Sequence, residues 1–284
     1  MHIGIFAKTF VRSSVEETME AVAAHGLHCV QWNFSVAGLS TMPERLNPDL
    51  ITRIRHAAQT HQIELAALSG TFNMIDPDTS RVQRHLKALE GVAAACAELG
   101  IPIITLCTGS RDPSDQWRWH PENRSPRAWR DLTMALRRAL EIAEDYRVTL
   151  AIEPEPGNVV DSACKGRRLL DEMQSPLLKI VMDGANLLRQ AEPSRMQEVL
   201  QEAFALLGDS LVLAHAKDFS LTGDGEQVAA GSGLLDYDAY LHLLSAARYT
   251  GPLILHGLRE DQVDVSVAFL QRKLAALRQE ETSD

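Results

Sequence analysis

Short runs of apolar and β-branched residues alternate along the chain with longer segments in which apolar residues recur every three or four positions. The short runs predict strands buried on both faces, and the longer segments predict amphipathic helices packed against them. We expect strands at 2–6, 28–34, 63–70, 101–109, 148–155, 178–186, 211–218 and 252–257. Helices are expected near 15–25, 48–60, 80–99, 126–146, 163–173, 237–248 and 262–277, with one more that starts near 193. Ser13 or Ser14 suits the N-cap of the first helix, and Gly100 suits the end of the third.

Eight strand–helix pairs follow one another in order, which is typical of a parallel sheet covered by helices. The fold class is therefore α/β, and we expect a single domain over residues 1–284. An open doubly wound sheet could also hold eight strands, but no G-x-G-x-x-G motif follows the first strand. The even spacing favours closure into a (β/α)8 barrel, the TIM barrel, whose usual length is about 250 residues.

Composition narrows the function classes. The chain has 284 residues and a formal net charge of −10, so a general nucleic-acid binder, which needs a basic face, is not expected. A local basic patch could still hold a phosphorylated or carboxylated small molecule. No stretch approaches the roughly 20 apolar residues of a membrane span, and none of the four cysteines has C-x-x-C spacing. We expect a cytoplasmic protein with reduced thiols.

Two long connections follow strands, at 110–125 and 219–235. Segments after the strands lie at the C-terminal mouth of a barrel, where such folds build their active sites. Loops of this length in a compact domain are usually functional or disordered. The first contains Trp117, Trp119 and His120 and looks too aromatic for a disordered spacer.

Polar side chains end four neighbouring strands of the expected barrel: Glu153, Asp183, His215 and His256. A barrel brings these strand ends together at one level. Two carboxylates and imidazoles suit Mn2+, Mg2+, Zn2+, Co2+ or Fe2+, and a cation is the simplest remedy for the repulsion between buried like charges. A lone Asp or His at a strand end often only caps a helix, but four at consecutive ends favour a divalent metal site.

Further residues of the mouth are candidates for substrate contact or proton transfer. Lys217 could polarise a carbonyl, although an ion pair with Asp218 is an equal alternative. Glu155 shares a strand face with Glu153 and could serve as a second base or as a partner to a ligand. Substrate contacts could come from Arg111, Trp119, His120 and Trp32. For the arginine a loop-ordering ion pair is an even alternative, and for the tryptophans plain packing is.

These motifs resemble the xylose-isomerase-like barrel superfamily, which includes sugar isomerases, ketose 3-epimerases, inosose dehydratases and endonuclease IV. The resemblance covers essentially the whole chain. It is carried by A-I-E-P-E at Glu153, V-M-D-G-A-N at Asp183, L-A-H-A-K-D at His215, G-S-G-L-L-D from Gly231, and Y-T-G-P-L-I-L-H ending at His256. The order of motifs is fairly specific for the superfamily and weakly specific for substrate.

The resemblance implies that a Glu, an Asp, a His and a last Glu hold the metal. The first three fall on Glu153, Asp183 and His215, whereas the fourth falls on His256. Asn186 stands where the family has a histidine after the sixth strand, and we take it as a candidate substrate contact. Gln31 stands where a glutamate often ends the second strand. With His256 in place of a glutamate, an epimerase using two metal-bound carboxylates is in doubt, but the histidine could bind metal or carry a proton.

The resemblance therefore implies a metal-dependent isomerase or epimerase of carbohydrate metabolism that acts on a sugar, sugar phosphate or keto-polyol. An enediolate would form, with Glu153 or Glu155 as base and His256 or Lys217 as acid. The alternative is a dehydratase or β-eliminating lyase acting on a keto-sugar or keto-inositol. A metal-dependent phosphodiesterase of damaged DNA is remote, because the mouth has few histidines, and a non-catalytic sugar-binding barrel is disfavoured by the ligand set. The family also allows a homo-oligomer, which no apolar stripe in this sequence proves.

Overall fold

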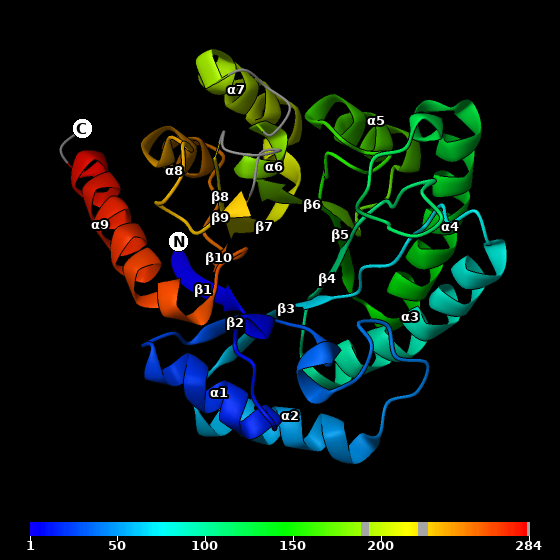
Figure 1. Ribbon diagram of the computed structural model, residues 1–284, viewed down its shortest axis with the longest axis horizontal. Coiled ribbons are helices and arrows are strands. Elements are labelled where there is room, and N and C mark those ends of the chain that lie inside the picture. The colour runs from blue at the N-terminus through cyan, green and yellow to red at the C-terminus, as the bar shows by residue number, and fades with distance from the viewer. Residues whose placement is uncertain (189–192, 221–226, 283–284) are drawn as a thin grey trace.

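Eight parallel strands close into a barrel in the described part of the chain (Figure 1), in the order β1-β10-β7-β6-β5-β4-β3-β2. This computed structural model describes residues 1–188, 193–220 and 227–282. The strands are β1 (His2–Phe6), β2 (Cys29–Trp32), β3 (Glu64–Ser69), β4 (Ile103–Leu106), β5 (Thr149–Ile152), β6 (Leu178–Asp183), β7 (Leu211–Ala216) and β10 (Pro252–Leu255). The predicted (β/α)8 barrel is confirmed.

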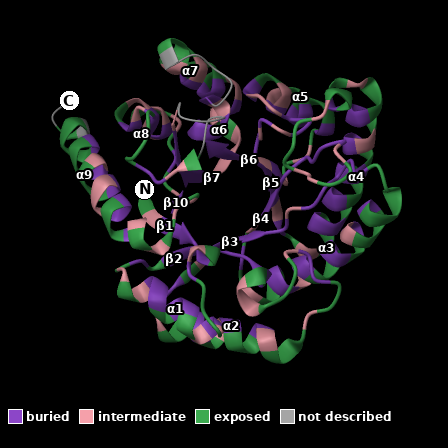
Figure 2. Ribbon diagram, in the orientation of Figure 1, coloured by how far each residue is buried: buried purple, intermediate pink, exposed green. Residues whose placement is uncertain are grey.

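Helices form a ring around the strands, with their purple, buried faces turned inward and their green faces outward (Figure 2). The ring contains α1 (Val15–Ala24), α2 (Pro48–Thr60), α3 (Thr79–Leu99), α4 (Pro126–Tyr146), α5 (Ala163–Met173), α7 (Met196–Leu207), α8 (Tyr237–Ala246) and α9 (Val263–Glu281). Ser14 caps α1 by accepting from the Glu17 amide, and Gly100 ends α3 in the left-handed conformation. Both predicted helix signals are confirmed. Across the described residues, no helix is long and apolar enough to cross a membrane.

A second, smaller core fills the inside of the barrel. It consists of Phe6, Cys29, Ala66, Ala67, Ala151, Val181, Leu213 and Ile254, whereas the main core lies between the strands and the helices. Side chains alternate between the two sides of each strand, except where the β2–β3 register shifts and the consecutive Ala66 and Ala67 both join this core. The apolar layer therefore separates the two ends of the barrel.

The mouth is more elaborate than the sequence indicates. The seventh barrel strand ends at Ala216, two residues before the predicted end, and β8 (Asp218–Phe219) then pairs antiparallel with β9 (Gln227–Val228). A short helix, α6 (Gly184–Leu188), follows the sixth strand directly and precedes α7. The long connection at 110–125 contains a 3-10 turn, η3 (Pro121–Arg124). Part of the other long connection, 221–226, lies outside the described residues.

Candidate metal centre and its cavity

Three side chains of types that can bind a metal ion meet at the mouth of the barrel. Asp183 ends β6 and is the register partner of His215 on β7, and His256 directly follows β10. One ligand atom from each of the three side chains lies within 4.8 Å of those from the other two. The closed barrel brings together residues that are far apart in sequence, and each projects from the end of a rigid strand.

His215 is held in one orientation by contacts to both ring nitrogens. Its Nε2 lies 2.9 Å from Oε1 of Gln31, and its Nδ1 lies 3.1 Å from Oε1 of Glu153 and 3.6 Å from Oδ2 of Asp183. Gln31 in turn donates from Nε2 to the Thr105 hydroxyl over 3.1 Å, so its Oε1 is turned toward the histidine. An Nε2–H donated to Gln31 leaves Nδ1 directed at the two carboxylates, which is the arrangement of a metal-ligating histidine.

The carboxylates make this position attractive to a positive charge. Burial opposes protonation of His215, but Glu153 and Asp183 outweigh it and raise its pKa to about 9. Burial likewise opposes ionisation of Asp183, yet Lys217 and His215 hold its pKa well below the ordinary value. Without a metal, a proton on the imidazole therefore partly neutralises the two acids, and a divalent cation would do so more fully.

Lys217 is completely buried below the site and does not line the cavity. Its Nζ lies 2.8 Å from Oδ2 of Asp183 and donates to Oδ1 of Asn186 over 2.8 Å. The alternative ion pair with Asp218 is wrong. Asp218 instead accepts backbone N–H groups from residues 219, 231, 233 and 235 and so shapes the loop after β7.

Asn186 links the lysine to the other carboxylate of the site. Its Nδ2 donates to Oε1 of Glu153 over 2.8 Å, while its Oδ1 accepts from Lys217. Both ends of the buried amide are therefore used, which fixes its orientation. Glu153, Asn186, Lys217 and Asp183 form one chain of polar contacts from β5 across to β6 and β7. Asn186 is 2% exposed and does not line the cavity, so its place is beneath the site.

His256 completes the group and has an unused nitrogen. Its ring stacks on His215 with centroids 5.0 Å apart, and Phe6 contacts it at 5.1 Å. Burial, followed by the positive charges of His215 and Lys217, lowers its pKa well below the ordinary value. Its buried Nδ1 has no hydrogen-bond partner among the described residues. The imidazole ring of His256 is therefore neutral, and its Nδ1 is left without a hydrogen bond from the described residues around it.

These atoms fit a divalent metal ion. Nδ1 of His256 has no hydrogen-bond partner in the described structure, whereas Oδ2 of Asp183 is ion-paired with Nζ of Lys217 at 2.8 Å. Buried polar atoms are rarely left without a partner. This nitrogen, the Asp183 carboxylate and the Nδ1 of His215 together provide one oxygen and two nitrogen donors that could converge on a single cation.

A cavity of about 500 Å3 opens above the group. Glu153, Glu155, His215 and His256 line its floor and wall. Burial, and after it the charge of Glu153, raises the pKa of Glu155 to about 8. Glu155 is therefore a protonated carboxylic acid at neutral pH, directly beside the candidate metal ligands.

Like Asn186, four other residues proposed for substrate contact do not line this cavity. Arg111 pairs with Asp131 and donates to the Ile75 carbonyl, which is the loop-ordering role. His120 caps η3 by accepting from the Glu122 amide, and Trp119 packs beneath the Arg124 guanidinium. Trp32 is fully buried in the main core, because its neighbour Gln31 occupies the interior face of β2.

Other residues line the cavity without having been singled out as site residues. Lys8, just after β1, and Trp117, in the long connection after β4, both contribute to its wall. Both residues follow barrel strands, and segments after the strands form the mouth, so the sequence could have indicated that they line the cavity. His85 on α3 is half-buried, packs against Phe72 with ring centroids 5.5 Å apart, and lines the cavity. The position of His85 within a predicted helix did not indicate that its side chain lines the cavity.

The fold and this site define a class of protein: a TIM barrel with a candidate metal centre of one carboxylate and two imidazoles beneath its mouth cavity. The family model for the xylose isomerase-like TIM barrel matches residues 19–273. The chain belongs to this family, as the sequence motifs indicated.

Solved structures with the same fold are similar over nearly the whole chain. A 3-keto-D-glucoside 4-epimerase from E. coli is 18% identical with a TM-score of 0.74, covering 96% of this chain and 99% of its own. A D-tagatose 3-epimerase-like protein is 16% identical with a TM-score of 0.77, covering 99% of both chains. An IOLI protein with a bound zinc atom is 17% identical with a TM-score of 0.73, covering 97% of both. A search of curated proteins finds no match.

Proposed function

We propose that this chain is a divalent-metal-dependent isomerase or epimerase acting on a sugar, a sugar phosphate or a keto-polyol. The observation that carries the proposal is the convergence of Asp183, His215 and His256 within 4.8 Å beneath a cavity of about 500 Å3. A cavity of this size suits a small-molecule substrate. The epimerase names of two structural neighbours support the reaction class.

Asp183, His215 and His256 would hold the metal, with Glu153 beside them as a further ligand. When bound, a divalent cation polarises a carbonyl group and stabilises negative charge on its oxygen. Two imidazoles in the donor set favour Zn2+ or Co2+ over Mg2+, which prefers oxygen ligands. Asn186 and Lys217 lie below the ligands and hold Glu153 and Asp183 in place.

The two glutamates that line the cavity, Glu153 and Glu155, are the proposed groups for proton transfer. Glu153 is the proposed base that removes a proton from the carbon next to the substrate carbonyl, which gives an enediolate. Glu155, protonated at neutral pH because of its raised pKa, is the proposed acid. Return of the proton to the neighbouring carbon isomerises the substrate, and return to the opposite face of the same carbon epimerises it. Lys217 does not line the cavity, so we assign it the positioning of Asp183.

A lyase is the second candidate, and His256 is the observation that favours it. An epimerase that works with two opposed carboxylates lacks the second one here, whereas elimination of water needs one base and one acid. Glu153 and Glu155 supply such a pair on the same strand end. Keto-sugars and keto-inositols would be the substrates.

Metal analysis tests the site. Purified wild-type protein should contain about one divalent ion per chain at the mouth, and Asp183→Asn with His215→Ala should remove it. Asp161→Asn is the matched control, because this carboxylate pairs with Lys165 away from the cavity and should leave the metal content unchanged. Equal metal content in the double variant and the wild type would overturn the site.

Incubation with a panel of ketoses and keto-inositols in D2O tests the reaction. Solvent deuterium entering carbon, with no other change in mass, identifies an isomerase or epimerase. Loss of water identifies the lyase. Absence of exchange with every compound, in protein that carries its metal, contradicts both candidates.

A further inference from the structure

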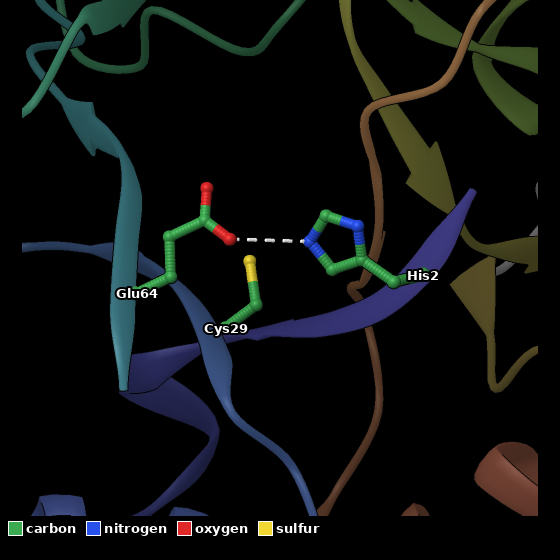
Figure 3. A group of neighbouring side chains, drawn as sticks. All are labelled: His2, Cys29 and Glu64. Atoms are coloured by element: carbon green, nitrogen blue, oxygen red, sulfur yellow. Dashed lines mark ion pairs between the residues drawn. The ribbon is translucent and has the colours of Figure 1, made fainter. Parts of the chain in front are cut away.

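A second group of metal-ligating side chains lies at the opposite end of the barrel. His2 begins β1, Cys29 begins β2 and Glu64 begins β3, and Figure 3 shows the three side chains pointing toward one another. Cys29 and Glu64 are register partners on adjacent strands, so their side chains leave the sheet on the same face. The starts of parallel strands lie at the end away from the mouth, so this group is separate from the candidate metal centre described above.

The spacing of the three ligand atoms suits one small cation. Nε2 of His2 lies 3.3 Å from Oε2 of Glu64, and the Cys29 sulfur lies within 4.8 Å of a ligand atom of each. Bonds of about 2.0–2.2 Å from tetrahedral zinc to nitrogen and oxygen place those two atoms roughly 3.3 Å apart. The histidine and the glutamate therefore already have the separation of two zinc ligands.

The surroundings leave the sulfur room and give an ion access to it. A side chain at Gly4 would place its Cβ 3.0 Å from the Cys29 sulfur, so the glycine keeps this space open. Cys29 is 1% exposed, whereas the side chains of His2 and Glu64 are 48% and 57% exposed. A cation can thus arrive from solvent on the two exposed ligands and meet the buried sulfur beneath them.

We propose that His2, Cys29 and Glu64 form a binding site for a thiophilic divalent ion of the zinc type, with water as the fourth ligand. A thiolate together with an imidazole selects Zn2+ or Co2+ over Mg2+ and Mn2+. Burial, followed by the charge of Glu64, raises the pKa of the Cys29 thiol, so the metal-free site holds a neutral thiol. Binding releases the thiol proton to solvent as the sulfur–metal bond forms.

The role that follows is structural. An ion at this place joins the first residues of three neighbouring strands, at the end of the barrel that contributes to stability rather than to catalysis. Cys29 belongs to the apolar layer inside the barrel, and other members of that layer, among them Ala66, Val181 and Ile254, separate the site from the mouth. Among the described residues, the barrel therefore offers one candidate metal site at each end, and the site at the end away from the mouth contains the sulfur ligand.

Co2+ titration of reduced, metal-free protein tests the proposal. A thiolate bound to Co2+ gives charge-transfer absorption in the near ultraviolet, which the Asp183, His215 and His256 group cannot give. We expect this band to grow to one equivalent per chain and to disappear in Cys29→Ser. His2→Gln and Glu64→Gln, at half-exposed positions where the fold tolerates change, should each weaken Co2+ binding at this site by roughly tenfold or more.

Matched controls separate the two sites and the other thiols. Cys107→Ser and Cys164→Ser should keep the band, and so should Asp183→Asn combined with His215→Ala, in which the proposed mouth site is lost. A missing band at saturating Co2+, in wild-type protein whose thiols are shown to be reduced, overturns the proposal. So does a band that survives Cys29→Ser or is unchanged by His2→Gln. These outcomes do not depend on whether the proposed enzyme activity exists.

Discussion

At the scale of single residues, the candidate metal centre depends on the buried ion pair between Lys217 and Asp183. Neither residue lines the cavity. Lys217 is fully buried, and its ammonium group is compensated by Asp183 and by the Asn186 amide oxygen. Burial disfavours both charged forms, but each partner restores the charge of the other. The lysine therefore keeps Asp183 ionised and oriented whether or not a metal is present.

Lys217→Met should strongly destabilise the metal-free protein, because it removes the ammonium group that lies 2.8 Å from the buried Asp183 carboxylate. Breaking a buried pair in this way costs about 3–5 kcal/mol. Urea denaturation with a chelator present measures the change in the free energy of unfolding. Lys165→Met is the control, since its pair with Asp161 is partly exposed and should be worth less than about 1 kcal/mol. Equal losses in the two variants would contradict the assigned role.

At the scale of elements, the loops above the strands position the cavity wall. Gly157, after β5, lies against the backbone of the long connection after β4, and a Cβ there would fall 1.9 Å from the Trp117 carbonyl oxygen. Asn158 strengthens the same contact by donating to the Gln116 carbonyl over 2.9 Å. The first long connection is therefore packed against the next loop, which places Trp117 in the cavity wall.

Gly157→Ala should force these two loops apart and lower the free energy of unfolding by roughly 1–3 kcal/mol, as overpacking does. Gly91→Ala is the matched control, because this glycine of α3 has open space around it. There the loss of backbone freedom in the unfolded chain should stabilise the protein by about 0.5–1 kcal/mol. Urea denaturation of both variants measures the two opposite signs, and a neutral Gly157→Ala would refute the packing argument.

The same connection should also respond to acid. Asp112 accepts from the Ser114 and Asp115 amides at 2.9 and 3.0 Å, and hydrogen bonds from the Ser114 amide and hydroxyl are the main cause that lowers its pKa to about 2. The folded state binds this proton less tightly than an unfolded chain does. The stabilisation is therefore complete above the ordinary pKa of about 3.9 and is lost as the pH falls toward 2.

Amide hydrogen-exchange protection at Ser114 and Asp115 measures this effect and should decline over that pH interval. Asp112→Asn keeps an oxygen acceptor at the same place but cannot titrate, so protection at the two amides should become insensitive to pH. Protection that falls equally in the wild type and in Asp112→Asn would place the acid sensitivity elsewhere in the molecule.

At the scale of the whole molecule, the proposed metal sites predict that the stability of the barrel depends on its metal content. An ion that binds only the folded barrel raises the free energy of unfolding by about 2.7 kcal/mol when its free concentration is 100 times Kd. Removal of divalent ions with a chelator should therefore lower Tm. Differential scanning calorimetry should show a smaller effect in Asp183→Asn with His215→Ala. A chelator effect of full size in that variant, with Cys29→Ser added, would show that neither proposed site binds the stabilising ion.

Much of the fold could be predicted from the sequence, because strand burial and helix capping are encoded locally. The helices at 126–146 and 163–173 have the predicted ends. Their positions at strand ends also predict that Glu153, Asp183, His215 and His256 lie at one mouth. Alternation along β2 puts Gln31 and Trp32 on opposite sides of the strand. With Gln31 facing the inside of the barrel, the sequence could have predicted that Trp32 packs against the helices. The single domain over 1–284 stays a prediction.

By itself, the sequence determined the barrel, the end that carries the mouth, and the residues of the metal-binding type at the strand ends. Only the tertiary structure decided which of them face one another. Lys217 pairs with Asp183 rather than with its chain neighbour Asp218, because β6 and β7 lie side by side while consecutive residues of a strand point apart. His2, Cys29 and Glu64 meet for the same reason. Contacts between distant segments depend on strand register and barrel closure, which local patterns do not specify.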